Sequence, residues 1–126
     1  MKGRFESLEW MEVPGFPARA ITIYRPEGHR PEAEAPALFV FDGQNAFEDA
    51  PWNTGGWHLH RAIDSLDAQE HVPPLVVAIP HGGATRMDEL TPWPIEGRGG
   101  RGDDFMAWVA GVVVPGRVAA LLGARF

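Results

Sequence analysis

Two short and wholly apolar runs constrain the fold of this sequence more than any other feature. Residues 37–41 read ALFVF and residues 75–80 read LVVAIP. Continuous apolar runs of this length are typical of strands covered on both faces. Residues 57–69 between them carry apolar side chains spaced as on one face of a helix, at Leu59, Ala62, Ile63 and Leu66. Strand, helix and strand in this order predict a parallel βαβ unit with a right-handed crossover.

The chain before this unit predicts an antiparallel hairpin. Large apolar residues recur at roughly alternate positions in residues 4–12, and apolar and polar residues alternate in residues 18–24. Pro14, Gly15 and Pro17 interrupt the chain between them. Two short strands around a turn are the simplest interpretation of this pattern.

After the second apolar run, residues 81–102 predict a long loop and residues 103–113 predict a helix. Asp103 and Asp104 suit the positively polarised first turn of that helix. One face of the helix is apolar, with Phe105, Trp108, Val109 and Val112. The expected fold class is therefore α/β.

Composition narrows the range of functions. The 126 residues fit one domain at most, and the formal net charge of −6 argues against a nucleic-acid partner. The chain has no cysteine, which excludes disulfides and thiolate chemistry. It contains no apolar stretch of signal-peptide or membrane-spanning length, so we expect no membrane partner and a cytoplasmic location.

A glycine-rich segment raises the question of a dinucleotide cofactor. Gly97, Gly99 and Gly102 match the pattern G-x-G-x-x-G before a helix. The fingerprint also requires a strand directly before it and an acidic residue about 20 positions later, and the sequence has neither. We therefore expect a loop here and no cofactor.

The histidines do not predict a metal site. His58 and His60, two residues apart on a helix, point about 200° apart and cannot converge on one ion. His60 and Asp64 are spaced to pair on the helix surface. His81 follows the second apolar strand at its carboxyl end, where α/β sheets bind ligands. It is a candidate pocket residue, with plain solvation as the alternative.

The serines give no nucleophile. The chain contains only Ser7, in the first expected strand, and Ser65, in the expected helix 57–69. Neither lies in the G-x-S-x-G turn that presents a catalytic serine between a strand and a helix.

Five segments, in their order along the chain, nevertheless resemble one family. These segments are FVFDGQNAF (39–47), TGGWHLHRAID (54–64), VPPLVVAIPHGG (72–83), RMDELTPWP (86–94) and GRGGRGDDF (97–105). They resemble the esterase-D-like and enterochelin-esterase-like esterases of the α/β-hydrolase superfamily, over residues 18–126. The resemblance implies a partial α/β-hydrolase sheet and a carboxylic ester as the small-molecule substrate.

The resemblance also implies roles for the residues after the first apolar strand. The backbone N–H of Gln44 would be half of an oxyanion hole, and Gly43 would let the chain turn and the substrate approach. Asp42 and Asn45 would brace the turn. A plain turn at the strand end is the alternative. The residues expected to bind substrate are Asp42, Gly43, Asn45, His81 and Trp93, with Trp52 and Trp57 as further candidates for the pocket wall or the core.

The chain departs from this family in one respect. The family's serine turn follows a fifth strand, and no such segment occurs here. We therefore expect residues 1–126 to be the N-terminal half of a single α/β-hydrolase domain, truncated before the nucleophile and inactive alone. A non-catalytic binding module and a fragment without function are the alternatives. The unpaired edge of residues 38–41 is expected to associate with a complementary chain or with itself.

Overall fold

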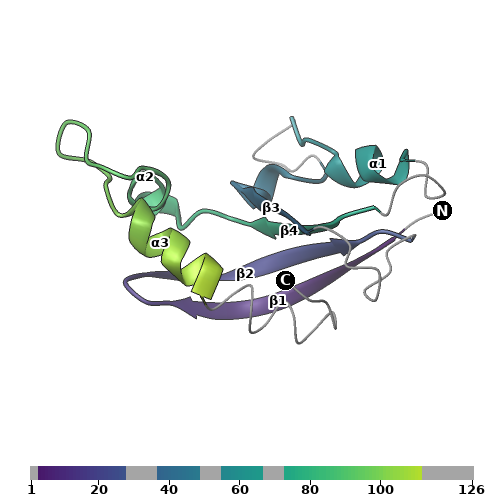
Figure 1. Ribbon diagram of the computed structural model, residues 1–126, viewed down its shortest axis with the longest axis horizontal. Coiled ribbons are helices and arrows are strands. Elements are labelled where there is room, and N and C mark those ends of the chain that lie inside the picture. Colours follow the sequence, from purple (N-terminus) through teal and green to yellow (C-terminus); the bar gives the residue numbers. More distant parts are fainter. Residues whose placement is uncertain (1–2, 28–36, 49–54, 67–72, 112–126) are drawn as a thin grey trace.

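The computed structural model describes residues 3–27, 37–48, 55–66 and 73–111. They build one four-stranded sheet of strands β1 (Arg4–Val13), β2 (Phe16–Arg25), β3 (Ala37–Phe41) and β4 (Leu75–Ile79). The strand order is β1-β2-β4-β3. Helices lie on both faces of this sheet (Figure 1). The mixed sheet with its helices confirms the expected α/β class.

β1 and β2 form the expected antiparallel hairpin. Val13 pairs with Phe16 across a turn of Pro14 and Gly15, and Gly15 takes the left-handed φ of 81° that glycine tolerates best. β2 is longer than expected and includes Pro17. Pro17 is tolerated because β2 pairs with β4 only over Thr22–Tyr24, which leaves this part of β2 paired on one side.

The two apolar runs lie side by side as parallel strands. Ala37 pairs with Leu75, and the register continues to Phe41 and Ile79. All five residues of β4 are buried, because β4 has a strand on each side and cover on each face. β3 pairs with β4 alone and forms an edge of the sheet as described.

Each face of the sheet has its own apolar cluster. Leu75, Val77 and Ile79 pack on one face with residues of α3 (Gly102–Trp108). Val76 packs on the other face with Ile63 of α1 (Leu59–Asp64) and with Tyr24. This division follows from the alternation of side chains along a strand.

Helix α1 is shorter than expected. It begins at Leu59 because His58 takes a left-handed conformation with φ 51° and ψ 40°, and the backbone N–H groups of residues 57–59 donate to the carbonyl groups of residues 45–47. Ile63 is buried as expected, but Ala62 and Leu66 are exposed, so the expected apolar face is only partly buried. Residues 67–69 of the expected helix lie outside the described residues.

The expectation of a long loop over residues 81–102 was wrong in part. It contains a 3₁₀ turn η3 (Gly83–Thr85), a short helix α2 (Arg86–Leu90) and a bridge between Ile95 and Arg98. Five helical residues are too few to show a periodic apolar pattern.

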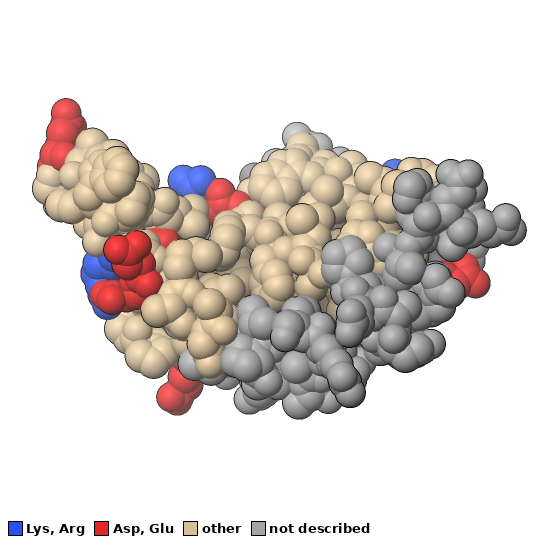
Figure 2. All heavy atoms as spheres, in the orientation of Figure 1, with Lys and Arg blue, Asp and Glu red and all other residues tan. Residues whose placement is uncertain are grey.

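Helix α3 begins as expected. Asp103 and Asp104 occupy its first turn, and Phe105, Trp108 and Val109 are buried. Val112 lies outside the described residues. On the face in Figure 2, charged side chains gather over the end of the molecule where α2 and α3 lie. None of the helices in the described ranges is both long and apolar enough to cross a membrane.

Candidate functional site

The turn after β3 has an unusual backbone. Asp42 takes a left-handed conformation with φ 53° and ψ 40°, and the 3₁₀ turn η2 (Gly43–Asn45) follows at once. The N–H of Asn45 donates to the carbonyl of Asp42 at 3.0 Å, and the N–H of Ala46 donates to that of Gly43 at 3.0 Å. Aspartate is one of the few residues that enter the left-handed region readily. The strand therefore ends sharply at Asp42.

Gly43 is required by close packing against β4. A Cβ atom at this position would collide with the backbone of Ala78 and Ile79. Gly43 is buried, so the turn lies directly against the end of β4. The position is closed to any side chain, which accounts for the glycine in DGQN.

The backbone N–H and the side chain of Gln44 differ in their hydrogen bonds within the described residues. No residue in the described ranges accepts a hydrogen bond from its backbone N–H, as is usual in the first turn of a helical segment. Its side-chain Oε1 accepts from the backbone N–H of His81 at 3.3 Å. The turn after β3 and the loop after β4 are thereby joined at the carboxyl ends of the two parallel strands.

The ring of His81 is held by its own loop. Its Nδ1 accepts a hydrogen bond from the backbone N–H of Gly83 at 2.9 Å. A neutral imidazole with Nδ1 as acceptor carries its proton on Nε2. His81 can thus offer an Nε2–H donor beside the turn.

An ion pair closes the same arrangement. Arg86, the first residue of α2, donates from Nε to Oδ1 of Asp42 at 2.9 Å and from its terminal nitrogen to Oδ2 at 2.6 Å. These hydrogen bonds hold the pKa of Asp42 below its usual value and raise the pKa of Arg86. A two-point pair fixes orientation as well as distance.

A buried ion pair anchors the loop after β4. Glu89 accepts two hydrogen bonds of 2.7 Å from Arg19, one of 2.7 Å from the Thr85 hydroxyl and one of 3.1 Å from the Gly82 N–H. Burial opposes ionisation of Glu89, but the hydrogen bonds from Arg19 and Thr85 outweigh it, and the pKa of Glu89 is lowered. Arg19 also donates to the Pro80 carbonyl at 3.0 Å. The loop that carries His81 is therefore tied to the hairpin.

The structure brings together four of the residues singled out from the sequence, namely Asp42, Gly43, Gln44 and His81. Asn45 lies in the same turn, and its carbonyl accepts from the N–H of Trp57 at 2.8 Å. The side chain of Trp93 is 67% exposed, and no hydrogen bond or ring contact joins it to this group in the part of the chain described. Trp57 is half-exposed, and Trp52 lies outside the described residues.

The sequence did not reveal Arg19, Arg86 and Glu89. The sequence does contain an indication of the position of Arg19. It is two residues from Ile21 and four from Ile23 in an alternating strand, so its side chain lies on the same face of β2 and points into the core with theirs.

The expected pairing of His60 with Asp64 was wrong. His60 Nε2 lies 2.7 Å from Glu48 Oε1, and Asp64 Oδ1 instead accepts from the Tyr24 hydroxyl at 2.5 Å. Side chains from other elements thus displaced the local pair. Across the described residues, no three histidine or acidic side chains are arranged to hold a metal ion.

Comparisons with known proteins find similarity among solved structures. The sequence matches no protein-family model and no curated protein. Among solved structures, the chain is similar to one described as "Enterobactin and Salmochelin Hydrolase IroE", with a TM-score of 0.53 and 20% sequence identity. The match covers 90% of this chain and 45% of that one. This chain therefore has a fold similar to slightly less than half of a hydrolase chain.

Proposed function

We propose that the turn after β3 is the oxyanion-binding half of a carboxylic-ester hydrolase site. The observation that carries the proposal is the backbone N–H of Gln44, which donates to no described residue. The turn that contains it is held by two contacts, from His81 to the Gln44 side chain and from Arg86 to Asp42. The similar fold of an enterobactin and salmochelin hydrolase supports the same assignment.

The chemistry follows from the position of this donor. Attack on an ester carbonyl places negative charge on its oxygen, and a fixed N–H about 3 Å away stabilises that charge by about 3 kcal/mol. Because Asp42, Gly43 and the Gln44 side chain are already held in place, the donor needs little reorganisation when the charge develops. Asp42, Gly43, Asn45, His81 and Trp93 would form the surrounding substrate surface.

The nucleophile has to come from residues outside these 126. Ser7 lies within β1, and Ser65 ends α1 with its hydroxyl donating to the Ala62 carbonyl at 2.6 Å. Neither serine lies in a strand-to-helix turn of the kind that presents a nucleophile. In this proposal the chain supplies an oxyanion donor and substrate surface, and a complementary segment supplies serine, acid and histidine. Without such a segment, the same donor would make an anion-binding module.

A pair of variants tests the donor directly. The chain is titrated with phenylphosphonate, a tetrahedral anion, while amide chemical shifts are followed by NMR. We expect the Gln44 amide to shift most, and Gln44→Ala to retain binding because it keeps the N–H. Gln44→Pro removes the N–H and should weaken binding at least about tenfold.

Two results would reject the assignment. One is equal binding by the proline and alanine variants, and the other is a set of shifts confined to residues distant from the turn. Circular dichroism of both variants checks that the fold is retained.

A further inference from the structure

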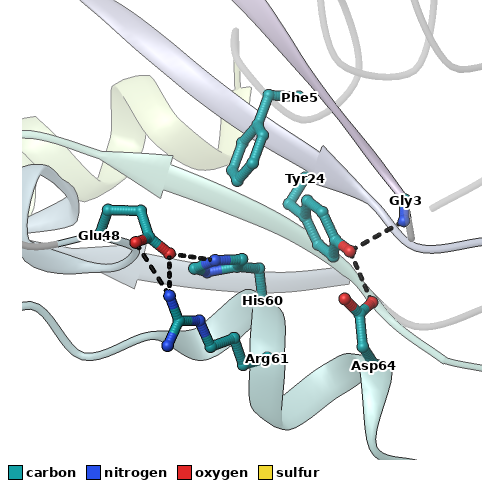
Figure 3. Close-up of a pocket in the computed structure, with 7 residues that line it drawn as sticks. All are labelled: Gly3, Phe5, Tyr24, Glu48, His60, Arg61 and Asp64. Carbon is teal, nitrogen blue, oxygen red and sulfur yellow. Dashed lines mark hydrogen bonds and ion pairs between the residues drawn. The ribbon is translucent and has the colours of Figure 1, made fainter. Parts of the chain in front are cut away.

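A cavity lies at the end of the sheet opposite to the turn with Gln44. This cavity of about 520 Å³ opens between α1 and the end of the hairpin where β1 begins and β2 finishes (Figure 3). Tyr24 in this cavity pairs with Val76 near the start of β4, whereas His81 follows the end of β4. The cavity is therefore separate from the turn at Gln44.

One wall of the cavity is aromatic. The ring of Phe5 lies 5.0 Å from that of Tyr24 and 5.6 Å from that of His60, between ring centroids. Neighbouring rings hold Phe5 in place, yet half of Phe5 is exposed. A fixed and accessible aromatic face offers both apolar contact and attraction for a cation.

The other end of the cavity is acidic. The Tyr24 hydroxyl donates to Asp64 Oδ1 at 2.5 Å and accepts from the Gly3 N–H at 3.0 Å. This fixes the Asp64 carboxylate, and its Oδ2 has no hydrogen-bond partner in the described ranges. Burial, the bond to Asp64 and the nearby charges of Asp64 and Glu27 raise the pKa of Tyr24 to about 12. The Asp64 carboxylate makes this end of the cavity negative.

The remaining charges of the cavity are paired. Arg61 donates to both oxygens of Glu48 at 3.1 Å, and His60 Nε2 lies 2.7 Å from Glu48 Oε1. Figure 3 shows Glu48 joined to His60, whose ring lies beside Phe5, and to Arg61, apart from the bond between Tyr24 and Asp64. The positive charge of Arg61 is balanced by Glu48, so among the described residues that line the cavity Asp64 is the charge without an ionic partner.

We propose that this cavity binds a small organic ammonium ion that carries an apolar body. The ammonium group donates to Asp64 Oδ2, and the apolar body lies against Phe5. A carboxylate of similar size would face Asp64 as a like charge, and a neutral alcohol would lose the ionic attraction. This site does not depend on the esterase proposal.

Three ligands that differ mainly in charge test the proposal on the unaltered chain. These are 2-phenylethylammonium, 2-phenylethanol and phenylacetate, each titrated into the protein and followed by NMR. We expect the ammonium ion to bind at least about tenfold more tightly than the alcohol, and phenylacetate to bind most weakly. Equal binding by all three, or tighter binding by phenylacetate, would overturn the proposal.

Variants then locate the site. Asp64→Asn keeps the size of the side chain and an acceptor for Tyr24 but removes the charge, and should weaken ammonium binding about tenfold. Phe5→Leu should also weaken it. Asp104→Asn removes an exposed charge on α3 and should leave binding unchanged. If Asp104→Asn weakens binding as much as Asp64→Asn, the attraction is non-specific and the proposed site is wrong. Should Asp64→Asn fail to fold, the three-ligand comparison still decides the matter.

Discussion

Arg86 donates two hydrogen bonds to the carboxylate of Asp42 and so joins the end of β3 to the start of α2. Asp42 holds the left-handed conformation from which the turn with Gln44 begins. Arg86 is therefore placed to hold the turn that carries Gln44, and in the proposed site it would be a positioning residue for the Gln44 N–H.

Arg86→Met should lower stability slightly and in a pH-dependent way. Asp42 has a depressed pKa, so its pairing stabilises the fold above the usual carboxyl value of 3.8 and is lost as pH falls through the lower folded-state value. Because Arg86 is half-exposed, solvent screens the pair and the loss of stability at pH 7 should be small.

Urea unfolding across a pH series measures this difference. The gap between the natural chain and Arg86→Met should close at the acidic end, while Arg98→Met, at an exposed position, should show no gap. A gap that grows as the solution is acidified would contradict the assignment.

Glu89→Gln should be strongly destabilising. It leaves the guanidinium of Arg19, which is 4% exposed, without its ionic partner. Loss of one partner of a buried pair costs about 3 kcal/mol or more, and replacing both with apolar residues costs less than the two single losses together. Denaturant unfolding of Glu89→Gln, and of Glu89→Met, Arg19→Met and the double variant Arg19→Met with Glu89→Met, measures this, and strict additivity of the two methionine variants would count against a coupled pair.

Gly43→Ala should destabilise the chain by about 2 kcal/mol, because the new methyl group meets the backbone of β4. Gly83→Ala is the matched control. Gly83 has open space around its Cβ position but a φ of 75°, so only about 1 kcal/mol of backbone strain is expected there. Thermal unfolding of both variants ranks them, and the reverse order would show that the turn can move off β4.

Leu38→Lys should reduce self-association through the edge of β3. Leu38 is 42% exposed on a strand that has one partner in the described sheet. Leu66 at the end of α1 is equally exposed, so Leu66→Lys serves as the control. Sedimentation velocity should show smaller species for Leu38→Lys only. A natural chain that stays monomeric at about 100 μM would remove the basis for this edge as a contact site.

The chain alone should not hydrolyse a chromogenic short-chain ester. Neither Ser7 nor Ser65 is placed as a nucleophile. Hydrolysis above background that persists when both serines are changed to alanine would show that another group attacks, and the proposed division of the site would fail.

The sequence predicted the strands well for physical reasons. A strand buried on both faces must be apolar throughout, and β4 is such a strand. β3 is equally apolar, so composition revealed it as well, but it is only partly buried and Leu38 is exposed, so the expectation that it is covered on both faces was wrong. His81 follows the carboxyl end of β4, and its backbone N–H donates to the side chain of Gln44 in the turn after β3. The sequence did not predict helix α2, because the helix has only five residues and three of them are charged, namely Arg86, Asp88 and Glu89.

The supporting ion pairs were not predictable in the same way. Arg19 and Glu89 are far apart in the chain, and Glu89 lies in a segment without a recognisable pattern. Asp42 and Arg86 meet only because β3 and β4 are parallel neighbours in register. Such contacts depend on tertiary structure, which local propensity does not describe.

The separation of paired strands along the chain bears on the order in which they form. Val13 pairs with Phe16 across a tight turn, so the hairpin of β1 and β2 can form early in folding, because its paired residues are close in sequence. Ala37 must instead find Leu75 after a long intervening segment has closed, which is slower because chain closure costs entropy. The hydrogen bond between the Gln44 side chain and the His81 N–H therefore forms late, and it exists only in molecules whose parallel strands have paired.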